Sequence, residues 1–185
     1  MIFDSVVWKE ELEKKIEDFK DYNINEFEVE DERLDMRTEE FFFITSFIVR
    51  KLIEALKLSD EYLASQYGVI KHQRNEDDCK IDFLNNHKID QYYNLESRNH
   101  ITLNLNRVCN LFIHSYIFII SIDKDCVDGV FVTTDYDKEK FILFISLDEY
   151  IRLLEGCCSD NIVSINHNRR TGRLVKSSGY CEDKE

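Results

Sequence analysis

At residues 106–114 the chain reads NRVCNLFIH, and this stretch predicts a helix with two different faces. An α-helix turns by about 100° per residue, so Arg107, Asn110 and His114 project from one side of such a helix. The other side carries only apolar side chains, namely Leu105, Val108, Cys109, Phe112 and Ile113. An apolar side of this width docks a helix firmly against a core. The stretch therefore predicts a packed helix that holds a guanidinium, an amide and an imidazole along one polar seam.

The residues before this helix favour a helical N-terminal body. Residues 6–22 carry apolar side chains at helical spacing among many charges, which is typical of an amphipathic, largely exposed helix. Thr38 then offers an N-cap for a second helix over residues 41–58, which is apolar on most sides as a central helix would be. A shorter helix is expected over residues 59–67, and Gly68 is expected to stop it.

The segment between this body and the polar seam is less regular. Residues 71–99 show no clear hydrophobic period and predict a loop-rich excursion around a short helix near residues 90–93. Residues 101–105 alternate between apolar and polar side chains, as a strand does. Continuing the register into residues 107–114 favours instead a helix that begins near Thr102, and both interpretations stay open.

After His114 the hydrophobic pattern changes to a period of two with β-branched runs. Three antiparallel strands joined by turns are expected at residues 116–122, 130–134 and 141–146. A short helix over residues 147–154 follows, with Gly156 placed just past its end. Residues 162–166 and 173–176 predict a final hairpin.

These patterns together predict an α+β fold, in which an N-terminal helical bundle is followed by a small antiparallel sheet with one covering helix. Three segments are expected along the chain. Residues 1–35 form an acidic helix and connection, residues 36–116 a helical core, and residues 117–185 a β-rich C-terminal portion.

The formal net charge of -13 is concentrated near the N-terminus, where residues 1–40 contain 15 acidic and 6 basic side chains. This balance argues against a protein that coats nucleic acid, because phosphate neutralisation requires clustered Lys and Arg. It favours a basic protein partner for the N-terminal region.

One basic cluster lies near the C-terminus and contains Arg169, Arg170 and Arg173. These residues are candidates for binding an anionic substrate. The alternative is a solvated, charged hairpin turn, and the sequence leaves both open.

Neither a metal nor a cofactor is expected. The 6 cysteines show no C-x-x-C spacing, and the scattered His72, His87 and His100 fit no known ligand pattern. Glycine-rich phosphate loops, dinucleotide fingerprints and nucleophile elbows are missing from the sequence. Without a signal-peptide pattern or an apolar run near about 18 residues, the chain is expected to be cytoplasmic and to have no membrane partner.

Arg107, six intervening residues and His114 on a helix resemble the Arg-x(4 to 6)-His motif of HEPN domains. The resemblance covers roughly residues 36–116. It implies an all-helical core that often dimerises. In active members it implies a metal-independent endoribonuclease whose site forms where two such motifs meet, in a toxin or defence setting. A homodimer and an RNA substrate are the partners that follow from it.

The chemistry of the three seam residues suits RNA cleavage by attack of the 2′-hydroxyl. His114 would act as general base or acid, Arg107 would stabilise the phosphorane, and Asn110 would orient the imidazole or a phosphate oxygen. A second chain would supply the complementary histidine. The alternative is structural: Arg107 pairs with a carboxylate of the first helices, Asn110 bridges a backbone group, and His114 lies at a helix-to-strand junction.

The corresponding alternative function is a non-catalytic interaction protein, such as an antitoxin, immunity factor or scaffold. Its acidic N-terminal region would then bind a basic partner. Whether the chain is an enzyme is left open by the sequence.

Overall fold

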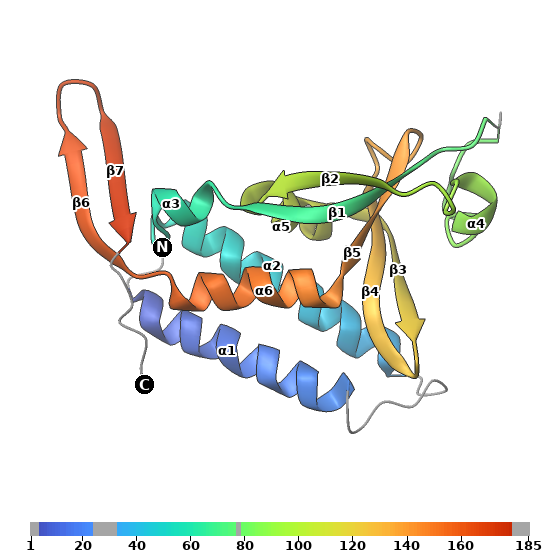
Figure 1. Ribbon diagram of the computed structural model, residues 1–185, viewed down its shortest axis with the longest axis horizontal. Helices are drawn as coiled ribbons and strands as arrows, with labels where there is room; N and C mark the ends of the chain where they lie inside the picture. Colours follow the sequence, from blue (N-terminus) through green and yellow to red (C-terminus); the bar gives the residue numbers. More distant parts are fainter. Residues whose placement is uncertain (1–3, 24–32, 77–78, 179–185) are drawn as a thin grey trace.

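The computed structural model describes residues 4–23, 33–76 and 79–178, and these residues form an α+β fold (Figure 1). The helices are α1 (Ser5–Asp21), α2 (Leu34–Glu54), α3 (Asp60–Leu63), α4 (Ile89–Tyr92), α5 (Leu105–Ile113) and α6 (Leu147–Ser159). The strands are β1 (Gln66–Gln73), β2 (Asn99–Asn104), β3 (Ser115–Asp123), β4 (Cys126–Thr134), β5 (Phe141–Ser146), β6 (Ile162–Asn168) and β7 (Arg173–Ser178).

Five strands form one sheet in the order β2-β1-β5-β4-β3, and every neighbouring pair is antiparallel. The main hydrophobic core lies between one face of this sheet and helices α1, α2, α5 and α6. The segment around α4 packs a smaller cluster against the other face, where it meets Ile117 and Ile142. Strands β6 and β7 form a separate hairpin that extends from the C-terminal end of α6 (Figure 1).

Tyr150 of α6 occupies the centre of the main core. Its ring stacks on Phe42 at a centroid distance of 4.5 Å and meets the edge of Phe112 at 5.0 Å. Its hydroxyl is hydrogen-bonded to the hydroxyls of Thr45, at 2.8 Å, and Ser46, at 2.7 Å. The phenol is therefore buried with its polar atom satisfied, and it joins α6 to α2.

Several predicted elements are confirmed. The helix expected at residues 6–22 is α1, the three expected C-terminal strands are β3, β4 and β5, and the short helix near residues 90–93 is α4. Helix α2 ends four residues earlier than expected, at Glu54. Leu56 adopts a φ of 59° there, and the amide of Lys57 donates to the Leu52 carbonyl at 2.9 Å. These contacts form a Schellman motif at the C-terminal end of α2. The left-handed position of this motif is usually a glycine, but here it is Leu56, so the sequence did not indicate the helix end.

The helical assignments around β1 and β2 were wrong. Helix α3 ends at Leu63 and β1 begins at Gln66, where a continuing helix was expected. Strand β2 confirms the strand interpretation of the residues before the seam, and α5 begins only at Leu105. Strand β1 pairs with β2 on one side and β5 on the other, so distant hydrogen-bonding partners override the local helical signals.

The predicted architecture needs two further corrections. Residues 36–116 are not all helical, because β1 and β2 lie among them. Helices α5 and α6 alternate with strands along the chain, and both contact the sheet, so it has more than one covering helix. The coarser α+β assignment, with N-terminal helices and an antiparallel sheet, is confirmed. The division into three segments at residues 35 and 116 stays a prediction.

Gly156 lies inside α6, although it was expected just past the helix end. A Cβ atom at this position would stand 2.8 Å from the Tyr62 ring. The glycine therefore serves close packing of α6 against Tyr62 and does not end the helix.

We predict that Gly129→Ala destabilises the fold by about 1–3 kcal/mol. A Cβ atom at Gly129 would stand 2.6 Å from both the Ile145 carbonyl oxygen and the Phe144 ring, so backbone must shift. The matched control is Gly68→Ala in β1, where the nearest atom lies 3.7 Å away. Urea unfolding of both variants measures the difference, and equal free energies of unfolding would contradict the prediction.

Candidate functional site

The three seam residues contact different parts of the structure. Arg107 Nη2 donates to Asp137 Oδ2 at 2.8 Å. The side-chain carbonyl of Asn110 accepts a hydrogen bond from Arg50 Nη1 at 2.7 Å. His114 is the exposed residue that ends α5. The structure therefore places Arg107 and Asn110 on α5 and His114 at its C-cap, and it gives the first two separate internal partners.

Asp137 explains the position of Arg107. It lies in the turn between β4 and β5 and is only 4% exposed. Besides Arg107, its carboxylate accepts a hydrogen bond from the Thr134 hydroxyl at 3.3 Å and lies 3.5 Å from Lys140 Nζ. A buried carboxylate requires such partners, because burial removes its hydration. This is the structural alternative for Arg107, with the carboxylate coming from a turn and not from the first helices.

Arg50 of α2 is the internal hydrogen-bonding partner of Asn110. Its guanidinium donates to the side chains of Asn106 and Asn110 on α5, and to Glu54 on its own helix at 2.9 Å. The link ties α2 to α5 across the edge of the main core. Sequence reasoning missed Arg50, since nothing in the local pattern of α2 indicates a partner 60 residues away.

The backbone at His114 departs from helical geometry, with φ -116° and ψ 24°. Its amide still donates to the Asn110 carbonyl at 3.0 Å, so His114 closes the last turn of α5 as its C-cap. Cys109 on the inner side of α5 is fully buried, and burial raises the pKa of its thiol to about 12. A thiol with so high a pKa remains protonated near neutrality and is a poor nucleophile. The catalytic assignment of Arg107, Asn110 and His114 stays a prediction.

The predicted basic cluster forms the tip of the β6–β7 hairpin. Arg169 and Arg170 are exposed in its turn, whereas the side chain of Arg173 lies outside the described part of the structure. The Asn168 side chain accepts hydrogen bonds from the backbone amides of Arg170, at 3.0 Å, and Thr171, at 3.2 Å. These contacts build a stable turn, as the second interpretation expects. A role of the three arginines in substrate binding stays a prediction.

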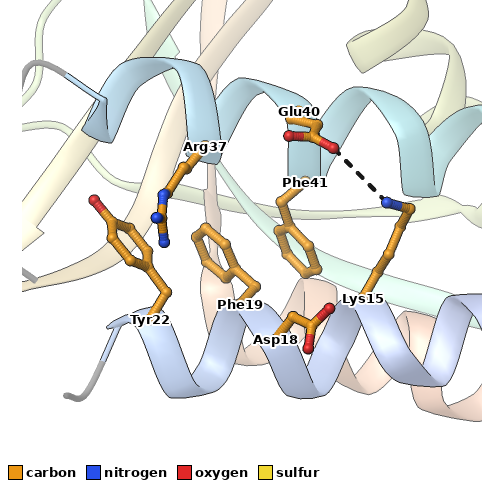
Figure 2. Close-up of a pocket in the computed structure, with 7 residues that line it drawn as sticks. All are labelled: Lys15, Asp18, Phe19, Tyr22, Arg37, Glu40 and Phe41. Atoms are coloured by element: carbon orange, nitrogen blue, oxygen red, sulfur yellow. Dashed lines mark ion pairs between the residues drawn. The ribbon is translucent and has the colours of Figure 1, made fainter. Parts of the chain in front are cut away.

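A hollow of about 220 Å³ lies between α1 and α2 (Figure 2). Its lining comprises Lys15, Asp18, Phe19, Tyr22, Arg37, Glu40 and Phe41. Phe19 and Phe41 stack at 4.1 Å and form an aromatic floor. At one end Arg37 lies over the Tyr22 ring at 4.4 Å, and at the other Lys15 Nζ lies 3.8 Å from Glu40 Oε1. The hollow therefore combines an apolar base with charged groups of both signs.

The outward side of α1 is acidic, and Asp18 on it also lines the hollow. Six acidic residues of α1 are exposed, namely Glu10, Glu11, Glu13, Glu17, Asp18 and Asp21. We call these six residues the acidic α1 face. Leu12, Ile16 and Phe19 on the other side of α1 are buried, so packing fixes which residues of this helix face outward.

The structure offers no grouping suited to a metal among the described residues: no three His, Cys, Asp or Glu side chains come together there. His72 is 3% exposed and its Nδ1 lies 3.3 Å from the Asn94 carbonyl oxygen, whereas His87 and His100 are exposed. Within the same residues, every helix is too short or too polar to span a membrane.

No family model matches this chain, and searches of curated proteins and of solved structures also find no match. HEPN membership therefore stays a prediction that depends on Arg107 and His114. Function has to be inferred from the surfaces that the fold displays.

We predict that Arg107→Ala and Asp137→Asn each lower the free energy of unfolding by about 1–3 kcal/mol. Arg107→Ala removes a charged hydrogen-bond donor from the buried carboxylate, and Asp137→Asn removes the negative charge that strengthens this bond. The double variant should lose less than the sum of the two, since both changes act on the same contact. Urea unfolding of the four proteins measures this coupling. Arg98→Ala, at an exposed arginine before β2, is the control. Additive losses would show that Arg107 does not support Asp137.

Proposed function

We propose that the chain is a non-catalytic interaction protein that binds a basic protein partner through the acidic α1 face. The observation that carries the proposal is the group of six exposed carboxylates on α1, one of which, Asp18, also lines an aromatic-floored hollow. An antitoxin, an immunity factor and a scaffold all act in this way, by occupying a surface of another protein.

The four basic side chains of α1 offset only part of the charge of its six exposed acids. Lys9 is buried, and Lys14 is exposed on the acidic side of the helix. Lys15 lies 3.8 Å from Glu11 and from Glu40, and Lys20 donates to Glu155 of α6 at 2.7 Å. The acidic α1 face consequently presents a field of one dominant sign on a chain whose net charge is -13. Such a field attracts a basic partner and raises its association rate.

The hollow supplies a place where a partner side chain can be anchored. Interfaces obtain most of their affinity from a few apolar or aromatic side chains that fill pockets. A volume of about 220 Å³ over the stacked Phe19 and Phe41 rings suits one side chain, and it is smaller than typical small-molecule sites of about 300–1,000 Å³. We therefore expect a partner segment with an apolar side chain flanked by Lys or Arg.

We predict that the triple variant Glu10→Lys, Glu13→Lys, Glu17→Lys weakens binding of a basic peptide by about tenfold or more. The probe is a synthetic Lys- and Arg-rich peptide with one central Trp, followed by fluorescence anisotropy at several salt concentrations. The three glutamates are spaced to lie on one side of α1, so the variant changes the charge on that side of the helix from negative to positive.

The control carries the same change of net charge at exposed acids remote in sequence from α1: Glu76→Lys, Asp90→Lys and Glu96→Lys. It should bind the peptide nearly as well as the unmodified chain. Equal losses in the two triple variants would show that net charge alone acts, and the proposal would fail.

The ribonuclease activity implied by the HEPN resemblance is the competing proposal. Exposure of the His114 side chain supports it, and so does the 48% exposure of the Arg107 side chain. Both groups can therefore meet an anionic ligand from solvent, although the contacts of Arg107 and Asn110 favour the structural alternative.

Incubation of the chain with labelled single-stranded RNA in EDTA decides between the two. On the interaction proposal we predict no cleavage above that in buffer. Cleavage that disappears in His114→Ala and persists in His87→Ala would establish the ribonuclease instead, because a metal-independent mechanism requires that imidazole. His87 is an exposed histidine outside the seam and so serves as the control.

A further inference from the structure

Strand β3 ends the five-stranded sheet on the side away from β2. Among the described strands it pairs with β4 alone, so one row of its backbone N–H and C=O groups has no strand beside it. Residues 115–122 contain no charged side chain, although charges at an edge are the usual protection against further pairing. At the opposite edge, by contrast, β2 carries Asn99, His100, Thr102 and Asn104.

An exposed apolar stripe of α2 adjoins this edge. Met36, Ile44 and Phe47 are 57%, 41% and 49% exposed. They flank the half-buried Phe43, whose ring lies 5.1 Å from the ring of Phe118 in β3. The Phe43–Phe118 contact places these apolar side chains of α2 next to β3, with the exposed Glu40 among them. Exposed apolar side chains that gather in this way mark interaction sites.

We propose that the β3 edge and the adjoining α2 stripe bind a second copy of the chain, with the two β3 strands paired antiparallel about a two-fold axis. Antiparallel pairing of identical strands is self-complementary, because each strand offers the other the same groups in reverse order. The register of β3 against β4 shifts between Ser115 and Ile117 and between Ser121 and Ile122, and such irregularities limit pairing at an edge. It is continuous from Ile117 to Ser121, so only this central part presents the regular ladder that pairing requires.

The charges around β3 favour a second copy over the basic partner of the acidic α1 face. Lys138 lies over the Tyr116 ring at 3.6 Å near the start of β3, and it also pairs with Asp135. Asp135 itself is 77% exposed, and Asp123, Lys124 and Asp125 are exposed at the other end of the strand. A two-fold axis brings the start of one strand beside the end of the other, so Lys124 would meet Asp135 and Asp123 would meet Lys138, twice in the dimer, while the uncharged centres pair. A basic segment paired with β3 would instead place its Lys and Arg side chains against the uncharged residues 115–122, where they find no acidic partner.

The proposed dimer uses other residues than the proposed function, although Arg37 and Glu40 of the hollow lie close to Met36 and Ile44 on the same helix. The dimer would display two acidic α1 faces, one from each chain. Two such faces strengthen capture of a partner with repeated basic segments without any new contact.

Analytical ultracentrifugation of the full chain from about 5 to 200 µM tests the proposal, since association depends on concentration. The expected mass at the upper end is twice that of the 22.1 kDa chain. Phe47→Glu on α2 and Ser121→Lys on β3 should each shift the equilibrium to the monomer. The controls Phe83→Glu and Val163→Lys change exposed apolar residues elsewhere and should leave the dimer intact.

Circular dichroism confirms that each variant is folded. Hydrogen exchange of the unmodified chain gives a second readout: alternate amides between residues 117 and 121 should be protected more strongly at high concentration than at low concentration. A monomer throughout the concentration range would overturn the proposal. A dimer that survives both Phe47→Glu and Ser121→Lys, with exchange of β3 independent of concentration, would also overturn it.

Discussion

The hydrogen-bonded burial of Tyr150 is the constraint on which the rest of the structure depends. Its ring contacts Phe42 of α2 and Phe112 of α5, and its hydroxyl is satisfied by α2. Helix α6 follows β5 directly and is capped by Ser146, so fixing Tyr150 fixes the helical layer on the sheet. Helix α1 packs on both α2 and α6, and its outward residues are those this layer leaves exposed. Both the hollow and the acidic α1 face therefore depend on a core contact made by another helix.

Local periodicity was sufficient for elements whose neighbours lie close in sequence. Strands β3, β4 and β5 follow one another as a meander, and α1 carries its own amphipathic pattern. Strands β1 and β2 were harder to predict, since β1 gains its stability between β2 and the distant β5. One local signal was overlooked: the Asn104 side chain accepts a hydrogen bond from the Arg107 amide at 2.9 Å, which fixes the start of α5.

The seam residues show why a candidate site is harder to predict than a helix. Spacing correctly placed Arg107 and Asn110 on one short helix, but it could not reveal what each side chain meets. Asp137 belongs to a turn 30 residues later, and Arg50 to a helix 60 residues earlier than Asn110. Both partners reach α5 only through the tertiary fold. The hollow is likewise invisible in the sequence, because it exists only where α1 lies against α2.

The distribution of charge would separate the two contacts proposed for this molecule. Like charges on two acidic α1 faces repel, so copies of the chain cannot associate there without a cost that grows as salt is lowered. Strand β3 carries no such charge over residues 115–122, and the backbone groups along its open side suit another strand of the same kind. A basic partner gains nothing from that uncharged edge and much from α1. On the two proposals, the acidity that would select a basic partner at α1 would therefore also direct self-association to β3.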